Sequence, residues 1–200
     1  TLVDRIVPGF PGSRIEKLQK VLGYKDEIIV NAEYFHLWVI EGPENLKEKL
    51  FIKESKLNII VTDSLQKYRT RKVRILNGAH TAMVGYGLLN GFDKVKDVVE
   101  DKKAGKFIEN LIFKEIIPSL EMDKTALESY ANDVLERFKN PYIKHYLKDI
   151  SLNSISKFKV RVLPSILSYI YKYDQVPNVL ATAFAYLIYL YKDIILCIMI

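Results

Sequence analysis

The sequence predicts a mainly α-helical protein in which a short α/β segment precedes an all-helical domain. Two patterns predict this order: the β-rich stretches fall within about the first sixty residues, and from about Ser64 onward apolar residues recur at helical spacing. The chain has 200 residues, 49% of them hydrophobic, so it can bury a sizeable core. We expect the α/β segment over residues 1–62 and the helical domain over residues 63–200.

The first elements are a strand and a helix. Residues 2–7, LVDRIV, have the β-branched content of a strand. Ser13 and Glu16 have the spacing of a capping box, in which each side chain bonds to the other residue's backbone N–H group. This pattern predicts a helix that opens at Ser13 and ends at Gly23.

The next elements are strands, and helices follow them. Residues 27–42 contain two β-rich stretches, and residues 57–63, LNIIVTD, form another strand candidate. Beyond Ser64 the predicted helices are separated by stop signals at Gly91, Pro118, Asn140-Pro141 and Pro177. Three residues are placed to act as helix N-caps: Asp101, Asp123 and Asn178.

Residues 179–200 are strongly apolar, which raises the question of a membrane span. Lys192 and Asp193 interrupt this stretch. Each would cost about 2.5–3.5 kcal/mol near the centre of a bilayer, so a core helix is the favoured interpretation. We therefore predict no membrane partner.

The charge pattern is typical of solvated helix faces rather than of a nucleic-acid-binding surface. The chain carries 30 basic and 24 acidic residues, and they alternate within segments such as 16–27 and 93–106. The only cysteine is Cys197, which excludes an internal disulfide and is typical of a reducing, cytoplasmic protein. The three histidines have no metal-ligand spacing, and we predict no metal.

The glycine-rich string GYGLLNG, residues 85–91, invites comparison with a phosphate-binding loop. Such a loop follows a strand and opens a helix. Residues 85–91 instead lie within or at the end of a helical pattern. The sequence therefore contains no dinucleotide-binding fingerprint.

The segment with the clearest chemistry is YRTRKVRILNGAH, residues 68–80. On an α-helix Lys72, Asn77 and His80 fall at about 0°, 140° and 80°, on one broad face, and span about 12 Å along the axis. An extended six-carbon chain matches this length better than a single small atom does. A structural interpretation also fits: a solvated basic helix start followed by a buried hydrogen bond between Asn77 and His80.

Several segments, in order along the chain, resemble the mannitol dehydrogenase family of long-chain polyol dehydrogenases. The spacing K-x4-N-x2-H at residues 72–80 resembles the catalytic signature of that family, and TLVDRIVP at residues 1–8 resembles the end of its other signature. Three further segments resemble parts of the family: EYFHLWVIEG, ERFKNPYIKH and SISKFKVRVLPS. The resemblance extends from residue 1 to about residue 190.

The resemblance implies an NAD-dependent dehydrogenase that oxidises secondary alcohols without a metal. Residues 1–62 would then be the end of a Rossmann-type nucleotide-binding domain and its junction, and most of the NAD site would lie before Thr1. Lys72 would be the general base, which requires a pKa well below the usual lysine value of about 10.4. Asn77 would stabilise the developing alkoxide, and His80 would bind a neighbouring hydroxyl.

Departures from the family pattern point to a branch that acts on sugar acids. Polyol members commonly have a glutamate three residues before the catalytic lysine, where this chain has Arg69, and a guanidinium suits a carboxylate-bearing substrate. A solvated surface charge is the alternative role for Arg69. The resemblance adds Lys144, His145 and Lys157 as substrate-binding candidates. Asp149 replaces a family arginine, and we assign it no role.

The resemblance thus favours interconversion of D-altronate and D-tagaturonate with NAD, and this chain alone would be inactive. One alternative is the sister reaction on fructuronate and mannonate, and another is oxidation of a neutral polyol. A chain complete in itself could instead be a helical binding or assembly module without catalysis. The sequence does not determine the oligomeric state or the choice between NAD and NADP.

Overall fold

The computed structural model describes residues 1–7 and 9–192, which form two compact units. The first comprises Thr1–Tyr68 and Tyr142–Lys144, and the second comprises Arg69–Pro141 and the chain from His145 onward. Asp193 and Cys197, which entered the sequence argument, lie outside the described residues.

The first unit is built on a three-stranded sheet with the order β1-β2-β3. Its strands are β1 (Leu2–Asp4), β2 (Leu37–Glu41) and β3 (Ile59–Thr62). β1 pairs with β2 antiparallel, and β2 pairs with β3 parallel. Strands within residues 2–7 and 57–63 are therefore confirmed. Only the second β-rich stretch of residues 27–42 forms a strand, because the first contributes a single bridge from Asn31 to Gly9.

The capping box predicted at Ser13 and Glu16 is wrong. Gly12–Arg14 form a 3-10 turn, and helix α1 (Ile15–Leu22) follows with Arg14 at its N-cap and no capping hydrogen bond from a side chain. Because Ser13 already lies within the 3-10 turn, it lacks the extended backbone that an N-cap requires. The predicted end at Gly23 is confirmed by its φ of 77°, a left-handed conformation that glycine adopts without strain.

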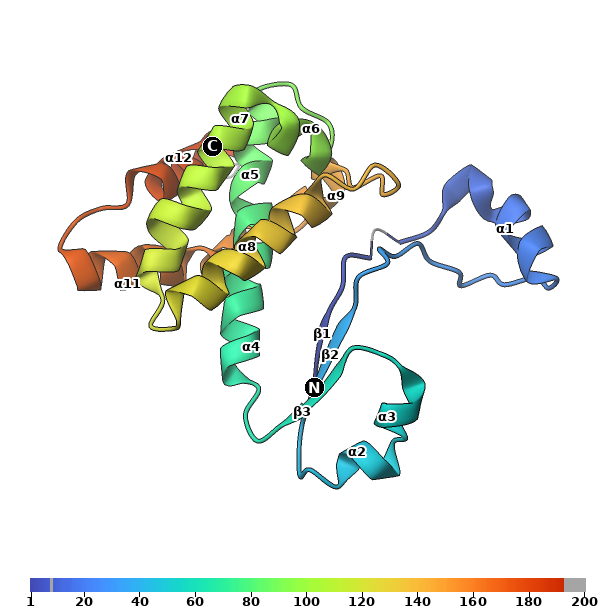
Figure 1. Cartoon of the computed structure of the whole chain (residues 1–200). Coiled ribbons are helices and arrows are strands. Elements are labelled where there is room, and N and C mark those ends of the chain that lie inside the picture. Colours follow the sequence, from blue (N-terminus) through green and yellow to red (C-terminus); the bar gives the residue numbers. More distant parts are fainter. Residues whose placement is uncertain (8, 193–200) are drawn as a thin grey trace. The chain divides into compact units, whose positions relative to one another are not determined.

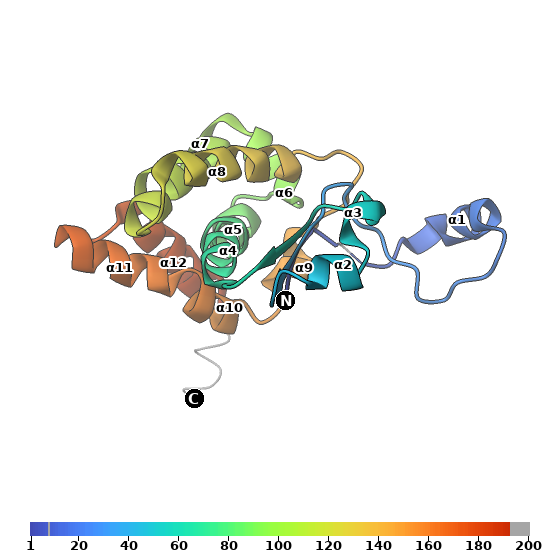
Figure 2. The same ribbon diagram turned by 60° about the horizontal axis from the view of Figure 1, so that its bottom comes forward.

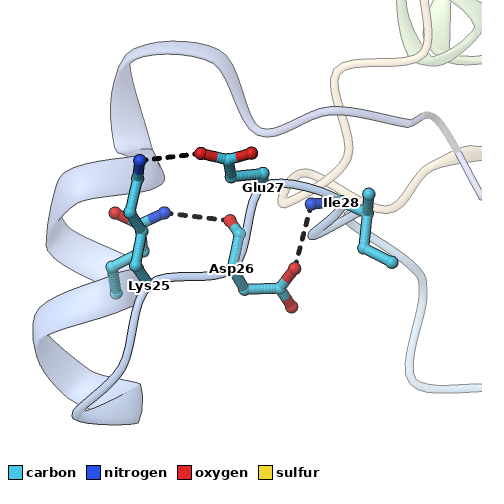
Figure 3. A network of polar contacts seen from close by, with 5 residues as sticks. Lys25, Asp26, Glu27 and Ile28 are labelled. Carbon is cyan, nitrogen blue, oxygen red and sulfur yellow. Dashed lines mark hydrogen bonds and ion pairs between the residues drawn. The ribbon is translucent and has the colours of Figure 1, made fainter.

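A small polar network closes the loop after α1 (Figure 3). The Gln19 amide donates to the carbonyl of Asp26, and the Asp26 carboxylate accepts from the backbone N–H of Ile28. Lys25 and Glu27 form an exposed ion pair at 2.7 Å. The charges interleaved along this segment thus pair locally at the surface, as the sequence pattern predicts.

Two short helices, α2 (Leu46–Lys49) and α3 (Ile52–Ser55), connect β2 to β3 (Figure 1). The apolar side chains of this unit form two small clusters. One gathers round Leu37, Val39 and Leu65, and the other round Ile40, Ile52 and Val61.

The second unit is helical and is organised round one long rod. From Arg69 onward, the rod comprises the end of α4 (Gln66–Arg71), the π-helix η2 (Lys72–Asn77) and α5 (Gly78–Leu89), which continue one another along one axis (Figure 1). Figure 2 looks nearly along this axis and shows the other helices round α5. Their bounds are α6 (Val95–Glu100), α7 (Lys102–Asn110), the π-helix η3 (Leu111–Ile116), the 3-10 turn η4 (Ile117–Ser119), α8 (Lys124–Phe138), α9 (Leu147–Ser151), α10 (Ser154–Arg161), α11 (Leu163–Tyr173) and α12 (Asn178–Leu190).

Two of the three predicted N-caps are confirmed. Asp101 accepts from the backbone N–H groups of Lys103 and Ala104, and Asp123 accepts from that of Ala126. The third prediction, Asn178, is wrong because this residue is already inside α12, where Pro177 is the N-cap residue and makes no side-chain capping bond.

A side chain distant in sequence supplies the missing cap of α12. Both carboxylate oxygens of Glu115 accept backbone N–H groups, from Val179 at 2.8 Å and from Leu180 at 2.7 Å. Burial raises the pKa of Glu115, and these two hydrogen bonds oppose that rise. A negative charge at a helix N-terminus also interacts favourably with the helix dipole. Glu115 therefore joins η3 to α12.

The glycines of residues 85–91 permit close helix packing. A Cβ atom on Gly85 would lie 2.9 Å from the backbone of Tyr186 on α12, and one on Gly87 would lie 2.5 Å from a methyl of Leu147 on α9. Neither residue is in a loop, which agrees with the expectation that this string is no phosphate-binding turn. None of the described helices combines the length and apolar character needed to cross a lipid bilayer.

Candidate functional site

A π-helical turn carries the K-x4-N-x2-H segment, so the α-helical spacing assumed for it is wrong. Lys72 begins η2, Asn77 ends it, and His80 lies in the first turn of α5. In a π-helix the backbone hydrogen bonds join residues five apart, which reduces the angle between Lys72 and Asn77 from about 140° to about 50°. The π-helix therefore brings these two residues closer to one line than α-helical geometry would, and π-turns of this kind are frequent at functional sites.

His80 is a buried imidazole held between two other rings. Its ring stacks on Phe138 of α8, with centroids 4.2 Å apart and planes at 19°. The ring of His145 meets it edge-on, with centroids 4.5 Å apart and planes at 85°. Only 7% of His80 is exposed, and its Nε2 atom has no hydrogen-bond partner within the described chain. An unpaired buried polar atom costs about 1–3 kcal/mol and so points to a ligand or water.

Positive and imidazole groups surround His80. Burial places the pKa of His80 well below its usual value, and His145, Arg161, Arg137 and Lys72 lower it further. The described groups that act on this pKa include no carboxylate. His80 is therefore neutral at neutral pH, with one ring nitrogen as donor and one as acceptor, inside a region suited to an anion.

These groups come from three helices and from the loop before α9, which carries His145. Lys72 is on η2 and Arg137 is on α8, one residue before Phe138. Arg161 ends α10 and donates from Nη1 to the hydroxyl of Thr81 at 3.5 Å. A carbonyl–glycine contact fixes α10 at this point, because a Cβ atom on Gly78 would lie 3.2 Å from the carbonyl oxygen of Arg161.

His145 is positioned by backbone pairing ahead of α9. Its carbonyl accepts from the N–H of Val95 at 3.0 Å, and the N–H of Leu147 donates to Asp93 at 2.9 Å. Burial lowers the pKa of His145 to about 4, with Asp149 acting in the opposite direction. His145 is thus neutral as well, and Asp149, which received no role from the sequence, lies close enough to act on it.

The remaining predicted residues are not among the groups that act on the pKa of His80. Arg69 is an exposed residue of α4, one turn before Lys72. Lys157 of α10 donates to the carbonyl of Ile150 at 2.9 Å, and burial together with Arg161 lowers its pKa. Lys144 belongs to the first unit. A substrate-binding role for these three residues stays a prediction.

The other two arginines of residues 68–80, Arg71 and Arg74, are not among the groups that act on the pKa of His80. Arg74 donates to the hydroxyls of Ser165 and Ser168 on α11, and burial lowers its pKa to about 10. The Arg71 guanidinium lies over the ring of Tyr130, 4.2 Å from its centroid. The arginines whose charge acts on His80 are instead Arg137 and Arg161.

Sequence reasoning missed Arg137, Phe138 and Arg161. All three lie in segments quoted for the family resemblance, ERFKNPYIKH and SISKFKVRVLPS, yet none carried a recognised role. A usable signal was present for Arg161, which follows Lys157 by four residues and so shares its face of α10. Among the described residues no group of three or more potential ligands could hold a metal ion.

Comparison with known proteins gives a consistent assignment. The profile of the mannitol dehydrogenase C-terminal domain matches residues 64–194. The chain is similar to altronate oxidoreductase of Bacillus subtilis (strain 168), with 50% identity over 193 residues, which cover 96% of this chain and 40% of that protein. Altronate oxidoreductase of Pectobacterium carotovorum subsp. carotovorum (strain PC1) is 45% identical over 192 residues, covering 96% and 39%. The chain thus spans about 40% of the length of these relatives.

Two solved structures share the fold. A D-sorbitol dehydrogenase in substrate-free form matches 95% of this chain and 39% of its own, with a TM-score of 0.77 and 25% identity. Mannitol 2-dehydrogenase of Pseudomonas fluorescens, solved as a ternary complex with NAD and D-mannitol, matches 93% and 37%, with a TM-score of 0.74 and 24% identity. The helical class predicted from the sequence is confirmed.

Proposed function

The chain belongs to the mannitol dehydrogenase family, and on that basis we propose that the whole protein is an NAD-dependent oxidoreductase interconverting D-altronate and D-tagaturonate. The observation that carries this proposal is the neutral, buried His80, whose Nε2 is unpaired and whose neighbours are cationic. A neutral imidazole suits a sugar hydroxyl, and cationic surroundings suit a carboxylate. A sugar acid provides both groups.

In the oxidation the reacting hydroxyl gives its proton to the Nζ atom of Lys72. NAD, when bound, would supply the acceptor for the hydride of the same carbon, and loss of that hydride and the hydroxyl proton would convert the alcohol into a ketone. This proton transfer requires the neutral amine form of Lys72. In the reduction Lys72 returns the proton to the carbonyl oxygen.

Asn77 and His80 position the substrate. The Asn77 side-chain amide makes no hydrogen bond to another described residue, so it can donate to the oxygen on which negative charge develops. The Nε2 atom of His80, which has no hydrogen-bond partner within the described chain, can form a hydrogen bond with the next hydroxyl of the sugar chain. The stack on Phe138 fixes the plane of the imidazole for this contact.

The glycine-rich string in the described part of the chain does not have the placement of a pyrophosphate-binding loop. The only glycine-rich string of the described chain, residues 85–91, lies against α9 and α12. We therefore assign the binding of NAD to other parts of the whole protein. Lys72, Asn77 and His80 would present the substrate to it.

The test is a comparison of substrates with the full-length protein, with NADH formation as the readout. We expect kcat/KM for D-altronate to exceed that for D-mannonate and for D-mannitol at least tenfold. A preference for mannonate would favour the sister reaction, and a preference for mannitol would exclude a sugar-acid specificity. Absence of turnover with all three, with NAD or NADP, would favour the non-catalytic binding module.

A further inference from the structure

We infer that Arg161 is the residue that binds the carboxylate of the substrate, which makes it the specificity determinant between sugar acids and neutral polyols. This inference rests on the proposed function and identifies the side chain that binds the carboxylate end of the substrate. It assigns this role to α10 rather than to Arg69 on α4.

The position of Arg161 next to the site is fixed at both its backbone and its side chain. Its carbonyl approaches Gly78 so closely that a Cβ there would lie 3.2 Å away. Its Nη1 lies 3.5 Å from the hydroxyl of Thr81, the residue that follows His80. Both contacts are to the first turn of α5, which also carries His80, and the charge of Arg161 acts on the His80 imidazole.

The bonding of Arg161 leaves it able to take a ligand. A guanidinium has five N–H donors, and the described part of the chain gives it one long hydrogen bond, to the Thr81 hydroxyl, and no ion-pair partner. Arg161 is half-buried, so folding takes this cation partly out of water, and this burial lowers its pKa. A partly desolvated guanidinium gains most from a bidentate carboxylate, the anion that matches its planar fork.

The order of residues along the rod also separates Arg161 from Arg69. The reacting oxygen lies by Lys72 and Asn77, and the next hydroxyl lies by His80, so the sugar chain extends from η2 toward α5. Arg161 lies at the α5 end of this line, beside Thr81. Arg69 lies one turn before Lys72, in the opposite direction. In altronate the oxidised carbon and the carboxylate are near opposite ends of the chain, which fits Arg161.

Two residues of α8, Arg137 and Phe138, also lie near His80. Phe138 covers one face of His80, and the positive charge of Arg137 lowers the pKa of that imidazole. Arg161 differs from Arg137 in that both its carbonyl oxygen and its guanidinium contact the first turn of α5. Removal of Arg161 should therefore weaken binding of the acid specifically, and it should leave the chemistry at Lys72 intact.

The experiment compares three charge-removing variants of the full-length enzyme on D-altronate and on D-mannitol. Arg161→Gln should raise KM for altronate at least tenfold, change kcat for altronate less than threefold, and change kcat/KM for mannitol less than threefold. Added guanidinium ion should restore part of the altronate activity. Lys159→Gln, which removes an exposed charge from the same helix, should leave both substrates within twofold of wild type.

Arg69→Gln tests the rival position. A carboxylate-specific loss in Arg69→Gln with none in Arg161→Gln would overturn the inference, and so would equal losses on both substrates in Arg161→Gln without rescue by guanidinium. If Arg161→Gln does not fold, Arg161→Lys is the second variant, because it keeps the positive charge but removes the planar guanidinium that binds a carboxylate with two hydrogen bonds. It should raise KM for altronate threefold or more with mannitol unchanged, and a wild-type KM would overturn the inference.

Failure of the inference and failure of the proposed function are distinguishable. If wild type oxidises altronate and Arg161→Gln behaves like Lys159→Gln, only the inference falls. If wild type prefers a neutral polyol, both fall.

Discussion

The imidazole of His80 and the ring of Phe138 stack with centroids 4.2 Å apart and planes at 19°. His80 comes from the rod that carries the K-x4-N-x2-H segment, and Phe138 comes from the last turn of α8. The stack allows the imidazole to move little out of its plane, so its Nε2 atom keeps one direction. The orientation of a predicted substrate-binding group therefore depends on a residue 58 positions away along the chain, as the difference between 138 and 80 shows.

Replacement of Phe138 should reduce activity through His80. Phe138→Leu removes the stacked ring, so we expect kcat/KM for altronate to fall about tenfold, an effect of about 1.4 kcal/mol. Phe107→Leu is the control, because Phe107 stacks on Tyr86, with centroids 4.5 Å apart, whereas the ring that stacks on His80 is Phe138. Steady-state kinetics and thermal melts of both variants separate the two effects. Equal losses of activity would mean that Phe138 acts only through stability.

Removal of the proposed base should abolish turnover and spare cofactor binding. General bases contribute about 10²–10⁴-fold, so Lys72→Ala should lower kcat at least a hundredfold while NAD binds as in wild type. Small primary amines added to the assay should restore part of the rate. Lys67→Ala, at an exposed lysine of α4, should keep wild-type turnover. If Lys72→Ala kept more than about a tenth of the activity, an effect under about 1.4 kcal/mol, Lys72 would not be the base.

The neutral imidazoles should make stability depend on pH. The folded pKa of His145 is about 4, and that of His80 is also below the usual 6.5. Between these values the unfolded chain binds protons that the folded chain does not bind, so stability is complete above about pH 6.5 and falls as the pH decreases toward 4. Each group contributes up to about 2 kcal/mol of this loss at pH 5.

Urea unfolding of the wild type and of His145→Gln at pH 7.5 and pH 5 measures this dependence. The carboxylates of the chain contribute equally to both proteins, so the difference between them isolates the imidazole. We expect the free energy of unfolding to fall about 1–2 kcal/mol further in the wild type than in the variant. Parallel losses would show that His145 is not buried as a neutral ring.

The cap that Glu115 places on α12 should contribute to stability and not to activity. Glu115→Gln removes the charge and one of the two acceptors for Val179 and Leu180, so we expect about 1–2 kcal/mol of destabilisation with kcat/KM unchanged. The matched control is Glu109→Gln, whose exposed ion pair with Lys106 should contribute under about 0.5 kcal/mol. Chemical denaturation compares the two. A loss in Glu115→Gln no larger than in Glu109→Gln would contradict the capping role.

The sequence by itself determined the order of β-rich and helical segments, the caps at Asp101 and Asp123, and the segment that carries Lys72, Asn77 and His80. These features are local: each depends on residue types at short spacing, which the chain alone specifies. The failed cap at Asn178 marks the limit of such reasoning. Its replacement, Glu115, lies 64 residues before Val179, and no local pattern links the two.

Only the tertiary structure decided what surrounds His80. The α-helical wheel placed Asn77 about 140° from Lys72, whereas the π-helix of the folded chain reduces that angle. Arg137, Phe138 and Arg161 come from two other helices and reach His80 only when these pack against α5. A side chain's chemistry is local, but its pKa, its stacking partner and its nearest charge belong to neighbours brought together by folding.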